Sequence, residues 1–323
     1  MFGPPPKVRS PLTYFWKAFR NLPHNRRWKL LKQLLPLLRR EPQNSSAESC
    51  VFRALANYPS DYSQLAALLG QPGKTPPQDE VEFLRSMVNR PTHYYGAIGV
   101  SDFLFTTAFA GILAPTRVIE IGTSTGFSAV ILAASLRRQH GSNGPVMVDT
   151  IDLRQKCLAD EAQSIGFEIP DLVPDLAPMI RLHVPHDSSF VAELAQPNEL
   201  SMIFIDADHR HPRVLLDVLR VAPYVRNGGW IVLHDIQLGT IGEEKRAAGQ
   251  PIPSRMPYGA QWLFDRWPFR KIEGGNIGAI QLPNDRRTLI LFGLRFMSVP
   301  FELEGKAEAR ACSALYQSLG ELT

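Results

Sequence analysis

Short apolar runs alternate with longer amphipathic stretches between residues 117 and 234. Runs that are apolar at nearly every position predict strands buried on both faces, as in a parallel sheet covered by helices. The predicted strands are residues 117–121, 146–151, 180–184, 201–205 and 230–234. The predicted helices between them are residues 125–139, 155–166, 188–195 and 211–224. This alternation indicates an α/β fold with a mostly parallel sheet and helices on both faces.

The pattern changes after residue 257. A helix is predicted at residues 258–267, and two apolar runs follow at residues 277–282 and 288–294 with a short turn between them. Two such runs joined by a short turn favour a hairpin. We therefore expect an antiparallel edge hairpin beside the parallel strands.

The segment before residue 117 reads as helical. A helix is predicted within residues 50–69, and the stretch GQPGKTPPQ at residues 70–78 breaks it. Asp79 is a suitable N-cap for a helix that begins near Glu80. A further helix, apolar on most sides, is predicted at residues 103–113.

The first 42 residues carry ten Lys or Arg and one acidic residue, although the net charge of the chain is +4. Residues 28–40 combine these charges with apolar positions in a helical pattern. Such a helix suits packing on the body or on a second subunit, which we favour, or contact with an anionic membrane surface. We predict that residues 1–90 form a basic helical extension, a lid or an oligomerisation element, and that residues 91–323 form one domain. A homodimer is one expected assembly.

Cysteine use and hydropathy predict a cytoplasmic protein. The three cysteines are far apart and no CxxC occurs, so disulfides and structural zinc are not expected. The N-terminus lacks the apolar core of a secretory signal, and no apolar run reaches the roughly 18 residues that a membrane-spanning helix needs.

The stretch VIEIGTSTGFS at residues 118–128 follows the first predicted strand of the sheet. Small residues let backbone N–H groups and a helix N-terminus approach a ligand. Glu120 at the strand tip favours a ligand with a cationic amine, and the spacing of Gly122 and Gly126 differs from a dinucleotide-binding GxGxxG loop. The alternative is an ordinary strand-to-helix turn.

Polar residues also follow the next strands. Asp152 stands where an acid accepts hydrogen bonds from a ribose diol. Asp187 is placed to accept a bond from an adenine amino group, with His186 or Ser188 beside the ring. Each of these residues has the simpler alternative of a helix N-cap.

Two carboxylates and two imidazoles follow the fourth and fifth strands. Asp206 and His209 lie in FIDADHRH, and His234 and Asp235 lie in LHDI. Acids at neighbouring strand tips can hold a hard divalent cation, and a histidine there can remove a proton near neutral pH. The alternative is loop capping with one core imidazole.

These strand-end loops resemble the class I S-adenosylmethionine-dependent methyltransferases. Within that class, EIGTSTGFS and FIDADH with NGGWIVLHD are similar to the catechol and caffeoyl-CoA O-methyltransferase branch, in its bacterial small-molecule subgroup. The resemblance covers roughly residues 95–283. It implies a Rossmann-like, seven-stranded sheet whose last strand is antiparallel, and S-adenosyl-L-methionine as cofactor.

The resemblance also implies roles for individual residues. The cofactor-binding set is Glu120, Gly122, Thr123, Ser124, Gly126, Ser128, Asp152, Asp187, Ser188 and Asp206. Asp206 and Asp235 stand at metal-ligand positions for Mg²⁺ or another divalent cation, but Ile236 replaces an asparagine ligand, so a metal site and a metal-free site both stay open. His209 takes the place of a lysine base, and Asp206 and His234 complete the catalytic set.

The chemistry expected from this arrangement is transfer of a methyl group to a hydroxyl of a small molecule. No [Asn/Asp]-Pro-Pro-aromatic motif for nitrogen acceptors follows the fourth strand. The aromatic residues expected to line the acceptor site are Tyr94, Tyr95, Tyr258 and Trp262. The alternatives are a nucleic-acid methyltransferase, which the basic arm supports weakly, and a non-catalytic cofactor-binding protein.

Overall fold

The structure is a computed structural model of the whole chain. It describes residues 45–90, 94, 97–140, 147–158, 160–252, 256–297, 299–303 and, near the C-terminus, 310–311, 314–315 and 317–318. The predicted helix at residues 28–40 therefore lies outside the described residues. Within the described part, no helix is both long enough and apolar enough to cross a membrane.

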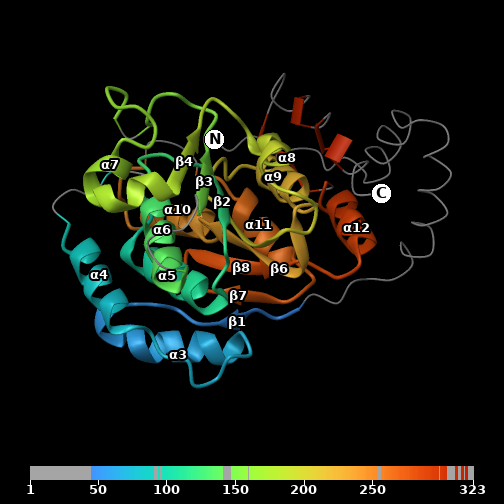
Figure 1. Cartoon of the computed structure of the whole chain (residues 1–323). Coiled ribbons are helices and arrows are strands. Elements are labelled where there is room, and N and C mark those ends of the chain that lie inside the picture. The colour runs from blue at the N-terminus through green and yellow to red at the C-terminus, as the bar shows by residue number, and fades with distance from the viewer. Residues whose placement is uncertain are drawn as a thin grey trace.

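One eight-stranded sheet organises the fold (Figure 1). Its order is β1-β7-β8-β6-β5-β2-β3-β4. Of the described strands, β8 alone runs against its neighbours. The strands are β1 (Glu48–Ser49), β2 (Val118–Ile121), β3 (Val148–Ile151), β4 (Ile180–His183), β5 (Leu200–Ile205), β6 (Val225–His234), β7 (Lys271–Glu273) and β8 (Ile277–Gln281).

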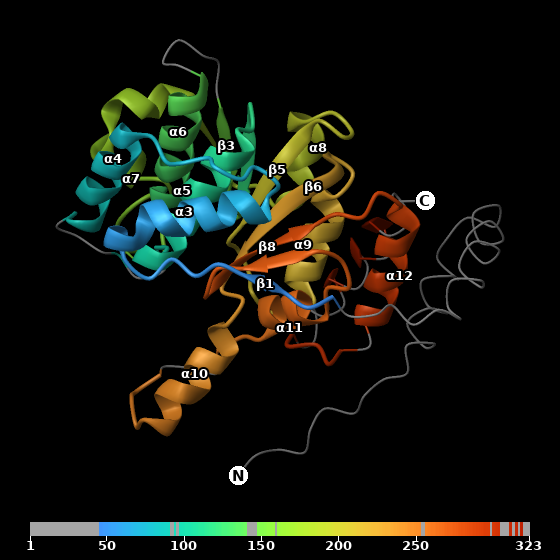
Figure 2. The ribbon, with the colours of Figure 1, turned by 90° about the horizontal axis from the view of Figure 1, so that it is seen from below.

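Helices cover both faces of the sheet (Figure 2). On one side lie α3 (Tyr58–Leu68), α4 (Gln78–Val88), α5 (Val100–Leu113), α6 (Phe127–His140) and α7 (Glu168–Leu172). On the other lie α8 (Val191–Leu194), α9 (Arg213–Val221), α11 (Gly259–Arg266) and α12 (Arg286–Phe296). Helix α10 (Leu238–Ala247) extends away from the body (Figure 2). The short 3₁₀ segments are η1 (Leu55–Asn57), η2 (Pro174–Met179) and η3 (Ser188–Phe190).

The strands form two separate cores because successive side chains point to opposite faces. In β5, Met202 and Phe204 pack with the α5 and α6 side, whereas Ile203 and Ile205 pack with the α9 and α11 side. A strand with apolar residues on both faces reads as a continuous apolar run, which is why the five central strands could be found in the sequence.

The predicted fold class, a mostly parallel α/β sheet with an antiparallel edge pair, is confirmed. The sheet has eight strands rather than seven, because β1 adds a two-residue parallel strand beside β7. This pairing joins residues 48–49 to the sheet, and the division of the chain at residue 90 stays a prediction.

The predicted second strand of the hairpin is wrong. Residues 286–296 form helix α12, whose first turn is capped by Asp285 through a hydrogen bond from Arg287 N to Oδ1 at 3.0 Å. The antiparallel pair is instead β7 with β8. A short apolar run does not by itself distinguish a strand from a buried helix, and the capping aspartate was the signal that favoured the helix.

One further predicted helix is wrong, and two helices begin at other residues than predicted. The described residues of the predicted helix at 155–166, namely 155–158 and 160–166, form an irregular loop with an antiparallel bridge between Lys156 and Ser164. The first described helix begins at Leu55 as a 3₁₀ turn rather than at residue 50. Helix α4 begins at Gln78 after Pro77, so Asp79 lies inside its first turn instead of capping it.

Candidate functional site

The loop after β2 and the loop after β5 meet at the switch point of the sheet, where the chain order reverses between these two neighbouring strands. Asp206 N donates to Ile121 O at 2.8 Å. Gly122 has a φ of +100°, and a Cβ atom there would lie 1.9 Å from the carbonyl oxygen of Asp206. Close packing between two chain segments therefore requires this glycine, whatever ligand lies outside.

Asp152 bridges the second predicted loop to the first. Its Oδ2 accepts hydrogen bonds from the backbone N–H groups of Thr123 and Ser124, both at 3.1 Å. Its Oδ1 accepts one from Arg154 N at 2.8 Å. The carboxylate is half-buried, and it fixes the glycine loop while keeping lone pairs for further donors.

Glu120 is fully buried at the tip of β2. Thr150, its register partner on β3, donates a hydrogen bond to Oε2. Burial raises the pKa of Glu120 to about 8, against the lowering effect of the Ser128 and Thr150 hydroxyls, and the nearby Asp206 and Asp152 raise it further. Without a cationic group beside it, this carboxyl is largely protonated at neutral pH.

Gly126 lies against the segment at residues 166–169. Its φ is +93°, and a Cβ atom there would lie 2.5 Å from Ile169 Cγ1. Gly166 N donates to Ser124 O and Glu168 N to Thr125 O, each at 2.9 Å. Residues 166–169 thus support the glycine loop through backbone hydrogen bonds and packing.

An ion pair attaches the end of α4 to this segment. Arg90 Nη1 lies 3.3 Å from Glu168 Oε1, and both side chains are buried. The Arg90 guanidinium stands 3.6 Å from the centroid of the Phe127 ring. Tyr94 packs edge-to-face on Phe167 with ring centroids 4.9 Å apart. Tyr94 is therefore near the glycine loop, and Tyr95 lies outside the described residues.

Asp187 and Ser188 are engaged with helix α9. Asp187 accepts hydrogen bonds from Ser189 N at 3.0 Å and from Arg220 Nη1 at 2.8 Å. The hydroxyl of Ser188 donates to Asp217 Oδ1 at 2.5 Å, and Ser188 is 1% exposed. Asp187 caps η3, which was the simpler alternative for this residue. The predicted adenine contact of Asp187 stays a prediction, and the Ser188 hydroxyl already has partners within the protein.

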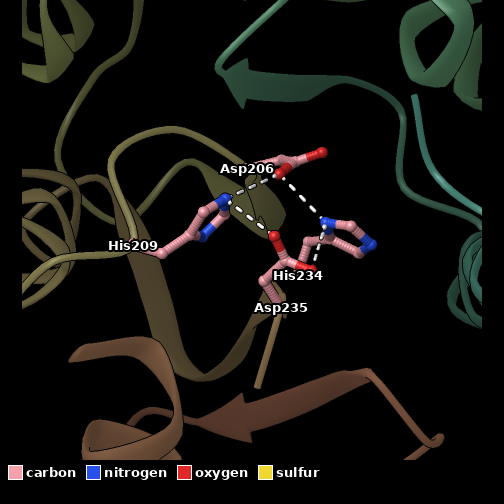
Figure 3. A group of neighbouring side chains, drawn as sticks. All are labelled: Asp206, His209, His234 and Asp235. Carbon is pink, nitrogen blue, oxygen red and sulfur yellow. Dashed lines mark hydrogen bonds and ion pairs between the residues drawn. The ribbon is translucent and has the colours of Figure 1, made fainter. Parts of the chain in front are cut away.

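Four predicted side chains come together beyond the ends of β5 and β6 (Figure 3). Asp206 and His209 follow β5, whereas His234 ends β6 and Asp235 follows it. One ligand atom from each lies within 4.8 Å of the others. Asp235 adopts φ +60°, a conformation in which L residues are uncommon, and Asn276 Nδ2 donates to its Oδ1 at 2.6 Å.

His234 stands between carboxylates on both sides of its ring. Nδ1 lies 3.0 Å from Asp206 Oδ1, and Nε2 lies 3.0 Å from Asp102 Oδ2. Burial alone lowers the pKa of His234, but Asp206, Asp235 and Asp102 outweigh it and hold this pKa well above the usual value. His234 is therefore an imidazolium with both nitrogens occupied, which fits charge balance better than proton abstraction.

His209 is more accessible than His234, with 18% of its side chain exposed against 9%. Its Nε2 lies 3.1 Å from Asp235 Oδ2 and 3.4 Å from Asp206 Oδ1. Two carboxylates facing one nitrogen keep the proton of a neutral imidazole on that nitrogen. Nδ1 is then the atom that can accept a proton.

The donor set fits a divalent cation held by Asp206 and Asp235. Both carboxylates are partly exposed, and one oxygen of each faces the same space beside His209 Nε2. Ile236 is 2% exposed and packs in the core, so it contributes nothing to such a site. Oxygen ligands of this kind suit hard cations.

The predicted aromatic pair Tyr258 and Trp262 forms a flat stack, with ring centroids 5.4 Å apart and an interplanar angle of 18°. Tyr258 also packs on Gly239 at the start of α10, where a Cβ atom would lie 2.3 Å from the ring. Ala260 N donates to His209 O at 3.1 Å. The stack is therefore attached to the loop that carries His209.

Residues 119–236 match the family described as a methyltransferase domain.

This segment is similar to a methyltransferase domain.

The matched methyltransferase segment runs from β2 through the residue after Asp235, so it contains all five parallel strands predicted from the pattern. The predicted resemblance to a methyltransferase is confirmed over these residues. The match leaves out residues 45–118 and everything after residue 236, and so it leaves out Asp102, Asn276 and the aromatic stack.

Several solved methyltransferases are similar to this chain at low identity. TomG, an O-methyltransferase from Streptomyces achromogenes solved with S-adenosylmethionine, is 17% identical, covering 69% of this chain and 98% of its own, with a TM-score of 0.40. An O-methyltransferase from Bacillus cereus solved with S-adenosylhomocysteine is 17% identical, covering 71% and 100%, with a TM-score of 0.41. A Geobacter sulfurreducens methyltransferase is 14% identical, covering 68% and 96%, with a TM-score of 0.38. No curated protein matches the chain. Similarity at this level does not transfer an activity to this chain.

Three residues of the candidate site could not be singled out in the sequence. Asp102 is the one charged residue of the mostly apolar α5, and that isolation was a signal. Thr150 was hidden inside a strand, and Asn276 sits in the β7–β8 turn, which the hairpin prediction had placed elsewhere.

Proposed function

We propose that the protein is an S-adenosylmethionine-dependent O-methyltransferase that acts on a hydroxyl of a small molecule. The observation that carries the proposal is the position of His209 between Asp206 and Asp235, because the backbone of Asp206 packs on Gly122 of the glycine loop after β2. This position supports His209 as the base, because open α/β sheets bind ligands at the carboxyl ends of their strands.

The glycine loop and the loops beside it form the proposed cofactor site. The backbone of residues 122–126 and the start of α6 line the methionine end, Asp152 binds the ribose hydroxyls, and Asp187 lies by the adenine. A positive charge near Glu120 lowers the pKa of this buried carboxyl from about 8, so the carboxylate form and the cofactor's ammonium group stabilise one another. S-adenosylmethionine supplies the electrophilic methyl group on its sulfonium.

His209 activates the acceptor in this proposal. Its Nε2–H faces Asp235 and Asp206, and its Nδ1 takes the proton of the acceptor hydroxyl. The two carboxylates stabilise the imidazolium that results, while the fixed cation His234 balances the charge of Asp206. The Tyr258–Trp262 stack supplies a flat surface for an aromatic or ring-shaped acceptor.

A divalent cation would add a second means of activation. Asp206 and Asp235 would hold it, and it would act as a Lewis acid that lowers the pKa of the acceptor hydroxyl. His209 stays a base rather than a ligand in this arrangement.

Calorimetry with S-adenosylmethionine tests the cofactor site. Wild type is expected to bind, and Asp152→Ala is expected to weaken binding at least tenfold because the ribose diol loses its acceptor. The exposed variant Asp175→Ala is the matched control. Formation of S-adenosylhomocysteine is then measured with phenols, sugars and polyketide hydroxyls as acceptors. No binding by the wild type, or binding unchanged in Asp152→Ala, contradicts the assignment.

A further inference from the structure

Glu302 joins two loops that lie far from it in the sequence. Its Oε2 accepts a hydrogen bond from His211 N at 2.7 Å, and its Oε1 accepts one from Tyr258 N at 2.8 Å. Its own backbone N–H donates to His211 O at 2.8 Å. One half-buried carboxylate therefore holds the loop after β5 and the N-terminal end of α11 at a fixed separation.

The two loops are also in direct backbone contact. A Cβ atom on Gly259 would lie 2.2 Å from His211 N and 2.5 Å from His209 O. Ala260 N donates to His209 O at 3.1 Å. The start of α11 thus sets the position of the His209 backbone. Glu302 strengthens the same contact by accepting hydrogen bonds from both loops.

The surroundings of Glu302 favour strong hydrogen bonds. The His211 ring is fully buried between Phe296 and Phe301, with centroid distances of 4.7 and 5.1 Å. Burial lowers the pKa of His211 to about 3, so this imidazole is a neutral packing group. A carboxylate that accepts from backbone N–H groups beside such an apolar cluster forms charge-assisted bonds, which are stronger than neutral ones.

We propose that Glu302 is a positioning residue for methyl transfer. It holds His209, on one loop, at a fixed place relative to Tyr258 and Trp262, on the other, so that base and acceptor surface face each other. The inference rests on the proposed function, and it extends the working site to the C-terminal segment, outside the matched methyltransferase segment. Misplacement of a reacting group by about 1 Å can cost on the order of a hundredfold in rate.

Amide hydrogen exchange tests the contact without reference to activity. Glu302→Ala is expected to speed exchange at the amides of His211 and Tyr258 at least tenfold, because each loses its acceptor. Glu302→Gln keeps one acceptor oxygen and places an NH₂ group against the other amide, so one of the two amides is expected to stay protected. Asp285→Ala, which removes a carboxylate cap from α12, is the control and should leave both amides protected.

Kinetics test the positioning role. Glu302→Ala is expected to lower kcat by about 10- to 100-fold and raise the KM of the acceptor, with S-adenosylmethionine affinity within twofold of wild type. Glu302→Gln should recover part of kcat, and Asp285→Ala should keep wild-type kcat.

Different results would overturn different claims. A kcat within twofold of wild type in Glu302→Ala, or unchanged exchange at both amides, overturns the positioning role. The positioning role is also overturned if Asp285→Ala loses as much kcat as Glu302→Ala while both variants have the same stability. Glu302 would then have only a structural role. A wild type that binds no S-adenosylmethionine overturns the proposed function instead, and the exchange experiment still decides whether Glu302 holds the two loops.

Discussion

Gly122 and Asp206 touch through their backbones: a Cβ atom on Gly122 would lie 1.9 Å from the Asp206 carbonyl oxygen. The glycine loop after β2 is therefore packed against the loop after β5, in addition to its proposed role in binding the cofactor. A side chain at residue 122 would move the candidate metal and base loop as well as the cofactor loop.

Gly122→Ala is expected to lower the free energy of unfolding by more than about 3 kcal/mol, because the backbone strain at φ +100° and the clash with Asp206 add together. Gly70→Ala is the matched control, since Gly70 has φ +76° but nothing within 4 Å of its Cβ position. Urea unfolding measures both. Equal losses in the two variants would show that the contact with Asp206 contributes nothing.

His209→Ala is expected to lower kcat by about 10²- to 10⁴-fold, the usual contribution of a general base, and added imidazole should restore part of it. His234→Gln is the comparison. Both His234 nitrogens face carboxylates, so imidazole is expected to give no rescue there. Rescue of His234→Gln but not of His209→Ala would exchange the two roles.

Glu120→Gln is expected to change how stability depends on pH. The pKa of Glu120 is about 8 in the folded protein against 4.5 ordinarily, so between these values the unfolded chain releases a proton that the folded chain keeps. The stability that Glu120 contributes is full below pH 4.5 and is lost as the pH rises to about 8. Glutamine does not titrate, so the variant should gain on the wild type from pH 5 to pH 8.

Urea unfolding of the cofactor-free protein at pH 5, 6.5 and 8 measures this difference. Glu243→Gln, on the exposed part of α10, is the control. A constant difference between wild type and Glu120→Gln at all three pH values would mean that Glu120 is ionised in the folded state.

Mn²⁺ binding separates a metal ligand from a base. The wild type is expected to bind Mn²⁺, Asp235→Ala to bind at least tenfold more weakly, and His209→Ala to keep its affinity because both carboxylates remain. Asp208→Ala, whose carboxylate pairs with Arg210, is the control. Calorimetry measures all four. Loss of binding in His209→Ala would make His209 a ligand and remove it as the base.

The strand ends could be predicted because burial on both faces leaves a continuous apolar run, as in residues 118–121 and 200–205. Parallel strands place their carboxyl ends at one edge, so Asp206 and Asp235 could be brought together from order alone. The same reasoning found His209 and His234 without any knowledge of side-chain direction.

The remaining contacts depend on tertiary packing that no local pattern records. Asp102 reaches His234 across 132 positions of sequence, and Glu302 reaches His211 across 91. The apolar run at residues 288–294 gave the wrong element because periodicity cannot separate a short buried helix from a strand. Irregular loops such as residues 155–166 are fixed by single bridges and buried side chains rather than by propensity.

Strand β1 contributes two residues to the sheet, yet it occupies the open side of β7. An unoccupied strand edge offers free N–H and C=O groups to any other extended chain. A chain shortened to begin at residue 55 would present such an edge. Removal of β1 would then cause edge-to-edge self-association in solution before it unfolded the domain.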